Sequence, residues 1–318
     1  MLAPGMRYRL HACAMTGPDD FNLFAIEPLD RASDARADPR WIAARLDDPA
    51  AVFAPLYRGD PLVRDGRAAF LGAAARQTFS ANAPVVFLGL KGSAPYFAID
   101  FSAALSASDA PFADIGVYMP LREAAAQLAD DDLAVIGHAR WLLDWHRRHA
   151  HCAACGAATE LKDGGAKRFC PACGAEHFPR SDPVAIVLAA HEDSCLLARS
   201  PHFPPGFLSA LAGFVEACET PEACAVRELR EEAGVTLTGV RYQFSQPWPF
   251  PSSLMMGFIA DAADKSLKLD EREIVEARWL ARNEIVALLA GERRDDVRLP
   301  PRFTIARRLI ERWASRRT

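Results

Sequence analysis

Residues 213–235 read GFVEACETPEACAVRELREEAGV, and this stretch decides what kind of fold we expect. Thr220 is a favourable helix N-cap, and Pro221 at the first helical position needs no partner for a backbone N–H. Gly234 suits the left-handed position that follows a helix. The sequence therefore predicts a helix from about Pro221 to Ala233.

Glu228, Glu231 and Glu232 are spaced so that their carboxylates share one face of this helix. Like charges at this spacing destabilise a helix by roughly 0.2–0.5 kcal/mol per pair. A hard divalent cation would reverse that effect, because Mg²⁺ and Mn²⁺ prefer carboxylate oxygen. The alternative is an ordinary solvated acidic face, but the fixed positions around these glutamates favour a metal site.

Gly213 is followed after five residues by Glu219, and seven more residues lead to Arg227 and the sequence RELREEAGV. This spacing resembles the Nudix box, GX5EX7REUXEEXGU with U aliphatic, at every specified position. The resemblance implies an α/β/α sandwich with a mixed sheet. It also implies an enzyme that hydrolyses a nucleoside diphosphate linked to another group. Glu219 and Arg227 are expected to form a structural pair that fixes the loop.

Chain length, net charge and the distribution of apolar residues exclude several classes of protein. A chain of 318 residues has room for two or three domains. Its net charge of −4 argues against broad, sequence-independent binding to nucleic acid. The N-terminus has no long apolar core and no run of 18 apolar residues occurs, so we expect neither a signal peptide nor a membrane span. We therefore expect a cytoplasmic protein whose cysteines are metal ligands or free thiols.

Four cysteines form two matched CxxC pairs that are fourteen residues apart, each followed by glycine; they are Cys152, Cys155, Cys170 and Cys173. This pattern resembles a zinc ribbon, in which four thiolates complete a tetrahedral, structural site. A redox dithiol is less favoured, because two matched pairs point to one shared ion. A ribbon that binds nucleic acid stays open, since Lys162, Lys167 and Arg168 lie between the pairs. Four further cysteines lack ligand spacing and are expected to be free thiols: Cys13, Cys195, Cys218 and Cys224.

The remaining patterns divide the chain into three parts. Residues 1–135 predict an N-terminal α+β domain with no dinucleotide-binding or P-loop motif. Residues 136–179 predict a connector helix, capped by Asp130–Asp132, and the ribbon. Residues 180–318 predict the hydrolase domain, in which Val184–Ala189 reads as a strand buried on both faces. Other expected strands are 85–88, 96–99, 115–118, 195–198, 239–244 and 255–260, and other expected helices are 40–46, 121–128 and one around 306–313.

Residues 245–253, SQPWPFPSS, alternate prolines with aromatic residues. Three prolines fix φ and remove three donors, which predicts a stiff extended loop that cannot be a central strand. Trp248 and Phe250 offer flat faces, and stacking of a base on such a face contributes roughly 1–3 kcal/mol. Gln246 can both donate and accept hydrogen bonds. The alternative is a polyproline docking segment or simple loop packing.

Together, the box, the ribbon and the proline–aromatic segment resemble the NADH pyrophosphatases, also known as NAD-capped RNA hydrolases, from about Ala139 to the C-terminus. The resemblance implies hydrolysis of NAD(H) to NMN(H) and AMP, removal of NAD caps from RNA, catalysis with Mg²⁺ or Mn²⁺, one structural Zn²⁺ and a homodimer. It implies that Glu228, Glu231 and Glu232 are catalytic, and that the divalent cation is bound by Glu228, Glu232, Glu273 and the backbone carbonyl of Ala212. The implied substrate contacts are Phe178, where relatives often have Tyr, and Gln246, Pro247, Trp248, Pro249, Phe250, Pro251, Ser252, Ser253 and Ala306.

Two other functions stay in view. One is a broader Nudix hydrolase that acts on ADP-ribose or dinucleotide polyphosphates. The other is a binding module, in which the ribbon grips nucleic acid beside a silent Nudix fold. The second is disfavoured because every carboxylate of the box is present.

Overall fold

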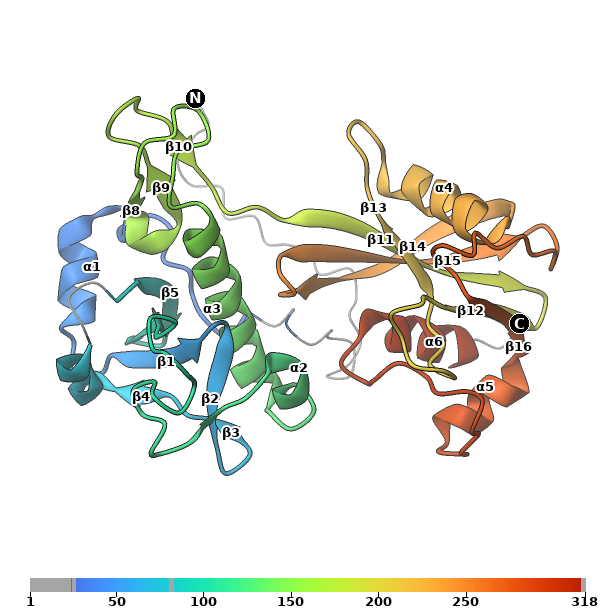
Figure 1. The fold of residues 1–318 in the computed structure, drawn as a ribbon, viewed down its shortest axis with the longest axis horizontal. Helices are drawn as coiled ribbons and strands as arrows, with labels where there is room; N and C mark the ends of the chain where they lie inside the picture. The colour runs from blue at the N-terminus through green and yellow to red at the C-terminus, as the bar shows by residue number, and fades with distance from the viewer. Residues whose placement is uncertain (1–23, 25–26, 80–82, 316–318) are drawn as a thin grey trace.

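The computed structural model describes Phe24, residues 27–79 and residues 83–315, which form two lobes bridged by a small cysteine-rich module. Helix α3 (Asp130–Arg148) runs along the N-terminal lobe and ends at this module. Strand β11 (Asp182–His191) leaves the module and enters the C-terminal lobe (Figure 1). No helix within the described ranges is long and apolar enough to cross a membrane.

The N-terminal lobe is built on a seven-stranded sheet whose main order is β3-β2-β1-β6-β5, with β4 beside β1 and β7 beside β2. The β1–β6 pair is parallel. The strands are β1 (Val52–Tyr57), β2 (Asp60–Arg64), β3 (Arg67–Ala68), β4 (Leu71–Gly72), β5 (Val85–Lys91), β6 (Ala94–Asp100) and β7 (Val117–Tyr118). The helices are η2 (Ala35–Ala37), α1 (Pro39–Leu46), η3 (Ala73–Thr78) and α2 (Leu121–Ala124), besides α3. This arrangement confirms the predicted α+β class of the lobe.

Three local predictions for this lobe are wrong. The strand expected over 115–118 keeps only its last two residues, because the N–H of Ile115 donates to Phe112 in a turn. The helix expected over 121–128 ends at Ala124, and the chain continues in tighter turns such as Gln127 to Ala124. Asp130–Asp132 do not cap α3; they lie in its first turn, where their charge favours the helix dipole, and Ala129 is the N-cap.

The cysteine-rich module is a three-stranded antiparallel sheet of order β10-β9-β8. Both CxxC turns close in the same way: the N–H of Gly156 donates to the carbonyl of Cys152, and the N–H of Gly174 to that of Cys170, each at 2.9 Å. The two glycines have φ of 77° and 76°, which favours glycine over other residues. The elements are β8 (Glu160–Lys162), η4 (Asp163–Gly165), β9 (Lys167–Phe169) and β10 (Glu176–His177).

The C-terminal lobe has a six-stranded mixed sheet of order β14-β15-β11-β12-β16, with β13 beside β11. The β11–β15 pair is parallel and the other pairs are antiparallel. The remaining strands are β12 (Ser194–Arg199), β13 (Leu211–Phe214), β14 (Leu237–Trp248), β15 (Ser253–Ala262) and β16 (Glu276–Ala281). The helices are α4 (Pro221–Ala233), α5 (Arg282–Leu289) and α6 (Ile305–Ser315).

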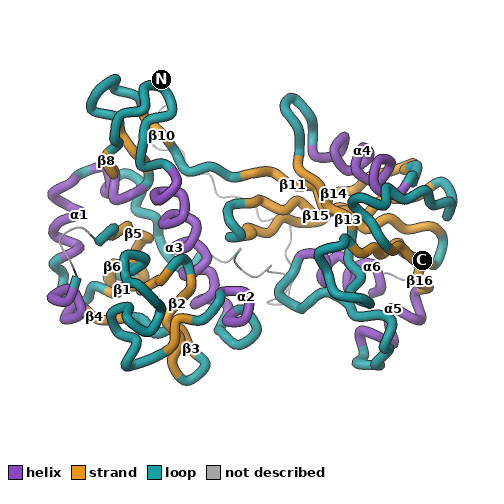
Figure 2. Tube along the Cα trace, in the orientation of Figure 1, coloured by secondary structure: helices purple, strands orange, loops and turns teal. Residues whose placement is uncertain are grey.

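Strand β11 separates two hydrophobic cores, as expected for a strand that is apolar on both faces. Ile186 and Leu188 pack with α5 and α6 on one side, while Ala185 and Val187 pack with α4 on the other. Figure 2 shows α4 on one side of this sheet and α5 and α6 on the opposite side. The predicted α/β/α sandwich is therefore confirmed.

The proline–aromatic segment differs from its prediction in one respect. A loop was expected from Ser245, but β14 continues through Trp248 and pairs Pro247 with Leu254. The expectation that the segment avoids the centre of the sheet is confirmed, because β14 is an edge strand. An edge tolerates proline, since a strand with one neighbour does not need every N–H for its ladder.

Candidate active site and zinc site

Helix α4 forms over Pro221–Ala233, as the sequence predicts. Thr220 caps α4, because its hydroxyl accepts a hydrogen bond from the N–H of Ala223 at 3.2 Å. Gly234 ends the helix with φ of 70°. Ala225, Leu229 and Ala233 are fully buried against the sheet, so the opposite side of α4 is left for its polar residues.

Glu219 and Arg227 form the expected pair. The guanidinium donates to both carboxylate oxygens of Glu219, from Nε and from Nη2, each at 2.8 Å. Nη2 also donates to the carbonyl of Phe214 at 3.0 Å, which ties the start of the loop to the helix. The bidentate contact lowers the pKa of Glu219 to about 2.

Gly213 makes room for a carboxylate. A Cβ atom at this position would lie 1.9 Å from the carboxyl carbon of Glu228. The side chain of Glu228 therefore lies directly on the backbone of β13, and no residue larger than glycine fits there without displacing it. Arg227 Nη1 donates to the same carboxylate at 2.6 Å and holds it from the other side.

The three helix glutamates do not share one environment. Glu228 and Glu232 are each 8% exposed, whereas the side chain of Glu231 is 54% exposed. Burial, together with the nearby carboxylates of Glu228 and Glu273, raises the pKa of Glu232 to about 8. Two buried carboxylates, Glu228 and Glu232, with the exposed Glu273 close to them, are a donor set that suits a hard divalent cation.

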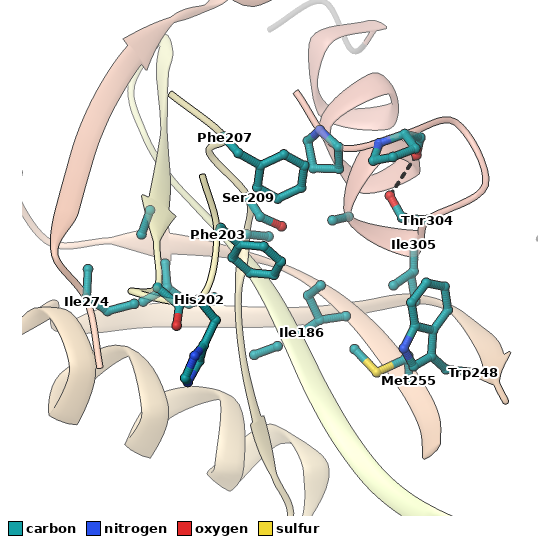
Figure 3. Close-up of a pocket in the computed structure, with 18 of the residues that line it drawn as sticks. Ile186, His202, Phe203, Phe207, Ser209, Trp248, Met255, Ile274, Thr304 and Ile305 are labelled. Carbon is teal, nitrogen blue, oxygen red and sulfur yellow. Dashed lines mark hydrogen bonds between the residues drawn. The ribbon is translucent and has the colours of Figure 1, made fainter. Parts of the chain in front are cut away.

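A cavity of about 730 Å³ opens beside these carboxylates (Figure 3). Glu232 and Glu273 line it, and so does Ala212 in β13. Trp248 from β14 and Ala306 from α6 line the same cavity. Its size is typical of sites that enclose a ligand as large as a nucleotide.

The four cysteines of the ribbon converge on one point. Their sulfur atoms all lie within 4.8 Å of one another, the only such group of possible metal ligands in the described part of the chain. Cys152 and Cys173 are 3.6 Å apart, and Cys155 and Cys170 are 3.5 Å apart. Zinc–sulfur bonds of about 2.3 Å in a tetrahedron place sulfurs about 3.8 Å apart, so the cluster fits Zn²⁺. The cysteines outside this group that the structure describes are free thiols, as predicted; Cys13 lies outside the described residues.

Known proteins match the whole of this arrangement. Residues 179–303 match the NUDIX domain, and residues 147–178 match the NADH pyrophosphatase zinc ribbon domain. The "NAD-capped RNA hydrolase NudC" of Mycobacterium bovis is 38% identical over 93% of this chain and 97% of its own length. This chain belongs to the NADH pyrophosphatase family of Nudix hydrolases.

Two further matches extend the comparison. The human "NAD-capped RNA hydrolase NUDT12" is 33% identical over 92% of this chain and 73% of its own length. A solved NUDIX hydrolase from Nitrosomonas europaea covers 52% of this chain and 89% of its own, with 23% identity and a TM-score of 0.40. Residues 50–145 match an NADH pyrophosphatase-like rudimentary NUDIX domain, so the N-terminal lobe of this Nudix hydrolase has a family of its own. The sequence reading had placed no motif there.

Several residues implied by the resemblance do not line the cavity of this Nudix hydrolase. Gln246 is almost fully buried and its amide donates to the carbonyl of Phe303 at 2.8 Å. Ser252 donates to Asp182 at 3.0 Å, and Ser253 is buried in β15. Phe178 is 60% exposed and outside the lining.

The rest of the proline–aromatic segment faces the other lobe. Pro247 and Pro249 line a second cavity, on the side of β14 away from Trp248. Phe250 contacts Trp248, with ring centroids 4.8 Å apart, and Pro251 follows a cis peptide bond. Alternate residues of one extended segment therefore face two different cavities, as the period of a strand dictates.

The sequence patterns described above did not predict several other residues that line the cavity. Arg122, from the N-terminal lobe, lines it and lies over the rings of Trp248 and Phe250 at 5.3 and 4.4 Å. Phe203 and Phe207 also line the cavity, from the loop SPHFPPGF at residues 200–207. That loop repeats the proline–aromatic pattern of residues 245–253, which is the signal that would have found it.

Proposed function

We propose that this Nudix hydrolase cleaves the pyrophosphate of NAD(H) to give NMN(H) and AMP, and removes NAD caps from the 5′ ends of RNA. One observation carries the proposal: Glu232 of the Nudix box, Glu273 and the aromatic ring of Trp248 line the same cavity. Groups suited to a cation that binds pyrophosphate thus lie beside a platform suited to a base. The names of the relatives, which are NAD-capped RNA hydrolases, agree with this substrate class.

We propose Mg²⁺ or Mn²⁺ as the catalytic ion, bound by Glu228, Glu232, Glu273 and the carbonyl of Ala212. When bound, such an ion neutralises pyrophosphate charge and lowers the pKa of a coordinated water. The burial of Glu228 and Glu232, and the raised pKa of Glu232, support this assignment, because a cation would relieve the repulsion. The cysteine cluster would bind one Zn²⁺ with a purely structural role, since four thiolates leave no open position.

Glu228, Glu231 and Glu232 are the proposed catalytic residues. One of these carboxylates would accept the proton of the attacking water. Arg122 supplies positive charge at the cavity wall and would bind a phosphate oxygen. Arg227 holds Glu228 and Glu219 in place, so that the carboxylates keep their positions during the reaction.

The proposed substrate contacts keep the full set that the resemblance implies. Trp248 and Ala306 have direct support, because they line the cavity. Gln246, Pro247, Pro249 and Phe250 would act mainly by holding Trp248. The remaining proposed contacts are Phe178, Pro251, Ser252 and Ser253.

Three organisational features are also proposals. The chain divides at 1–135, 136–179 and 180–318 into the N-terminal, ribbon and hydrolase domains. It forms a homodimer, which sedimentation of the purified protein would test. It works in the cytoplasm, because a four-thiolate zinc site needs reduced cysteines.

The decisive assay incubates the purified, metal-loaded protein with NADH, NAD⁺, ADP-ribose and NAD-capped RNA and identifies the products. We expect NMN(H) and AMP from the dinucleotides, and NMN with a 5′-monophosphate end from the RNA. Glu232→Gln should lose this activity. Release of free nicotinamide would contradict the proposal. Faster turnover of ADP-ribose than of any NAD substrate would favour the broader hydrolase instead.

A further inference from the structure

The cavity has aromatic rings at two separate ends. At one end Trp248 lies parallel to Phe303, with ring centroids 6.2 Å apart and an interplanar angle of 13°. At the other end Phe203 packs on Phe207, with centroids 4.8 Å apart and an angle of 34°. Figure 3 shows Phe203 and Trp248 apart from each other in the cavity, with Ile186 between them and Met255 beside Trp248.

The loop that carries Phe203 is held firmly. Its sequence contains Pro201, Pro204 and Pro205, each of which fixes a φ angle. The N–H of Phe203 donates to Ser200 at 3.0 Å, and the N–H of Phe207 donates to Pro204 at 3.1 Å. The loop is also tied to the chain that follows α5, since the N–H of Arg298 donates to Gly206 at 2.6 Å. The two rings are therefore positioned before any ligand arrives.

Phe203 is 44% exposed although it lies in a concave site. An apolar ring that stays exposed to solvent in a cavity lacks the stabilisation that burial provides. A ligand that binds in the cavity can bury it. Phe207 supports one side of the ring, so only the other side is open to the cavity. Apolar side chains of Ile186 and Met255 line the floor between the two aromatic ends.

The chemical groups that line the cavity suit a dinucleotide. Glu232 and Glu273 line it together with the two aromatic ends. A dinucleotide has two flat heteroaromatic rings joined through a pyrophosphate. A cation held by the carboxylates would bind the pyrophosphate, which leaves one ring for each aromatic end.

We propose that Phe203, supported by Phe207, is a second stacking platform of this enzyme and determines its specificity for substrates with two rings. One ring of NAD(H) stacks on Phe203 while the other lies against Trp248. This inference rests on the proposed function, because it assumes that the pyrophosphate of a dinucleotide reaches the carboxylates.

The test compares Phe203→Ala and Trp248→Ala on NADH and on ADP-ribose, with KM and kcat measured separately. NADH has two rings, so both substitutions should raise its KM, each by roughly 5- to 100-fold. ADP-ribose has one heteroaromatic ring, so only one of the two substitutions should raise its KM. Phe203→Tyr keeps the flat face and should leave both KM values within about twofold.

The matched control is Tyr242→Ala, which removes a half-exposed ring on β14 outside the cavity and should change neither KM. Thermal unfolding of each variant checks that the fold is retained. Phe203→Ala with an unchanged KM for NADH would overturn the inference, as would equal increases for both substrates in both variants. A wild-type enzyme that hydrolyses ADP-ribose but not NADH would instead overturn the proposed function.

Discussion

At the scale of single residues, the site depends on the absence of a Cβ atom at Gly213 and on the guanidinium of Arg227, which contacts several carboxylates. Gly213 has no Cβ, and Glu228 occupies the space where that atom would be. Arg227 then contacts Glu219, Glu228 and Glu231 at once. The spacing of the box is therefore a steric requirement as well as a chemical one: glycine, arginine and glutamate must meet at one place.

Gly213→Ala should displace the Glu228 carboxylate and lower kcat/KM for NADH by about 100-fold, because small misplacements of reacting groups have effects of this size. Binding of Mn²⁺, measured by calorimetry, should weaken in parallel. The control is Gly72→Ala, at a position where a Cβ would meet no atom within 4 Å. An alanine variant that keeps full activity would show that Glu228 has room to move.

The sequence predicted this residue-scale geometry well where a pattern ties residues together. Glu219, Arg227 and the helix carboxylates lie within twenty residues of one another, so spacing alone placed them. Arg122 was not predictable in this way, because more than a hundred residues separate it from Trp248 and only the tertiary fold brings them together. The burial of Glu228 and Glu232 against the exposure of Glu231 also needed the sheet beneath α4.

At the scale of elements, α3 and the ribbon are joined through one buried histidine. His146 Nε2 lies 2.8 Å from the carbonyl of Gly165, so this nitrogen must carry the proton and donate. Nδ1 lies 3.1 Å from Arg168 Nη1 and must accept. In the neutral imidazole, both ring nitrogens therefore make a hydrogen bond. Burial lowers the pKa of His146 to about 4.

This lowered pKa predicts how stability depends on pH. The unfolded chain gains the proton near pH 6.5 and the folded protein only near pH 4, so stability is complete above pH 6.5 and falls as the pH drops to 4, by up to about 3 kcal/mol. Urea unfolding between pH 7 and 4.5 should show this loss. His146→Gln retains a donor for Gly165 and cannot titrate, so its curve should be flatter. Parallel curves for the two proteins would contradict the assignment.

The zinc ribbon offers a second test at the element scale. Mass spectrometry of the native protein should find one Zn²⁺ per chain, and Cys170→Ser should lose it. Without the ion, residues 150–178 should become sensitive to protease, because a structural zinc site contributes on the order of 10 kcal/mol to folding. Cys218→Ser, at an exposed thiol outside the cluster, should retain the ion. Retention of zinc by the Cys170 variant would show that the four-sulfur site is wrong.

At the scale of the whole molecule, the N-terminal lobe contributes Arg122 to the cavity and contacts the segment that carries Trp248. Arg140 on α3 donates to the carbonyl of Pro249 at 2.8 Å and to the carbonyl of Gly59 at 2.7 Å. Its guanidinium also lies 5.2 Å from the centre of the Phe250 ring. One side chain thus joins the N-terminal sheet, α3 and the segment that presents Trp248. The sequence alone predicts no role for this lobe, because contacts between lobes leave no periodic pattern.

Arg140→Met should free the Pro249 carbonyl and let Trp248 shift, which raises the KM for NADH about tenfold with a smaller change in kcat. A positioning role predicts this split, whereas general destabilisation would lower the fraction of active enzyme and reduce kcat instead. Arg147→Met is the control, on the same helix but at an exposed arginine paired with Asp144. Identical kinetics for the Arg140 variant and the wild type would contradict the role.

The junction at Pro249 also bears on how this family can diversify. The Arg140 guanidinium of the N-terminal lobe donates to the Pro249 carbonyl of the C-terminal lobe. Substitutions in the two lobes must therefore be compatible with each other. A chimera that joins the catalytic half of a relative to this N-terminal lobe would place a different loop against Arg140, whose position fits the native loop at Pro249. Substrate preference should therefore be inherited as a unit that includes the rudimentary half, even though no carboxylate from its described residues lines the cavity.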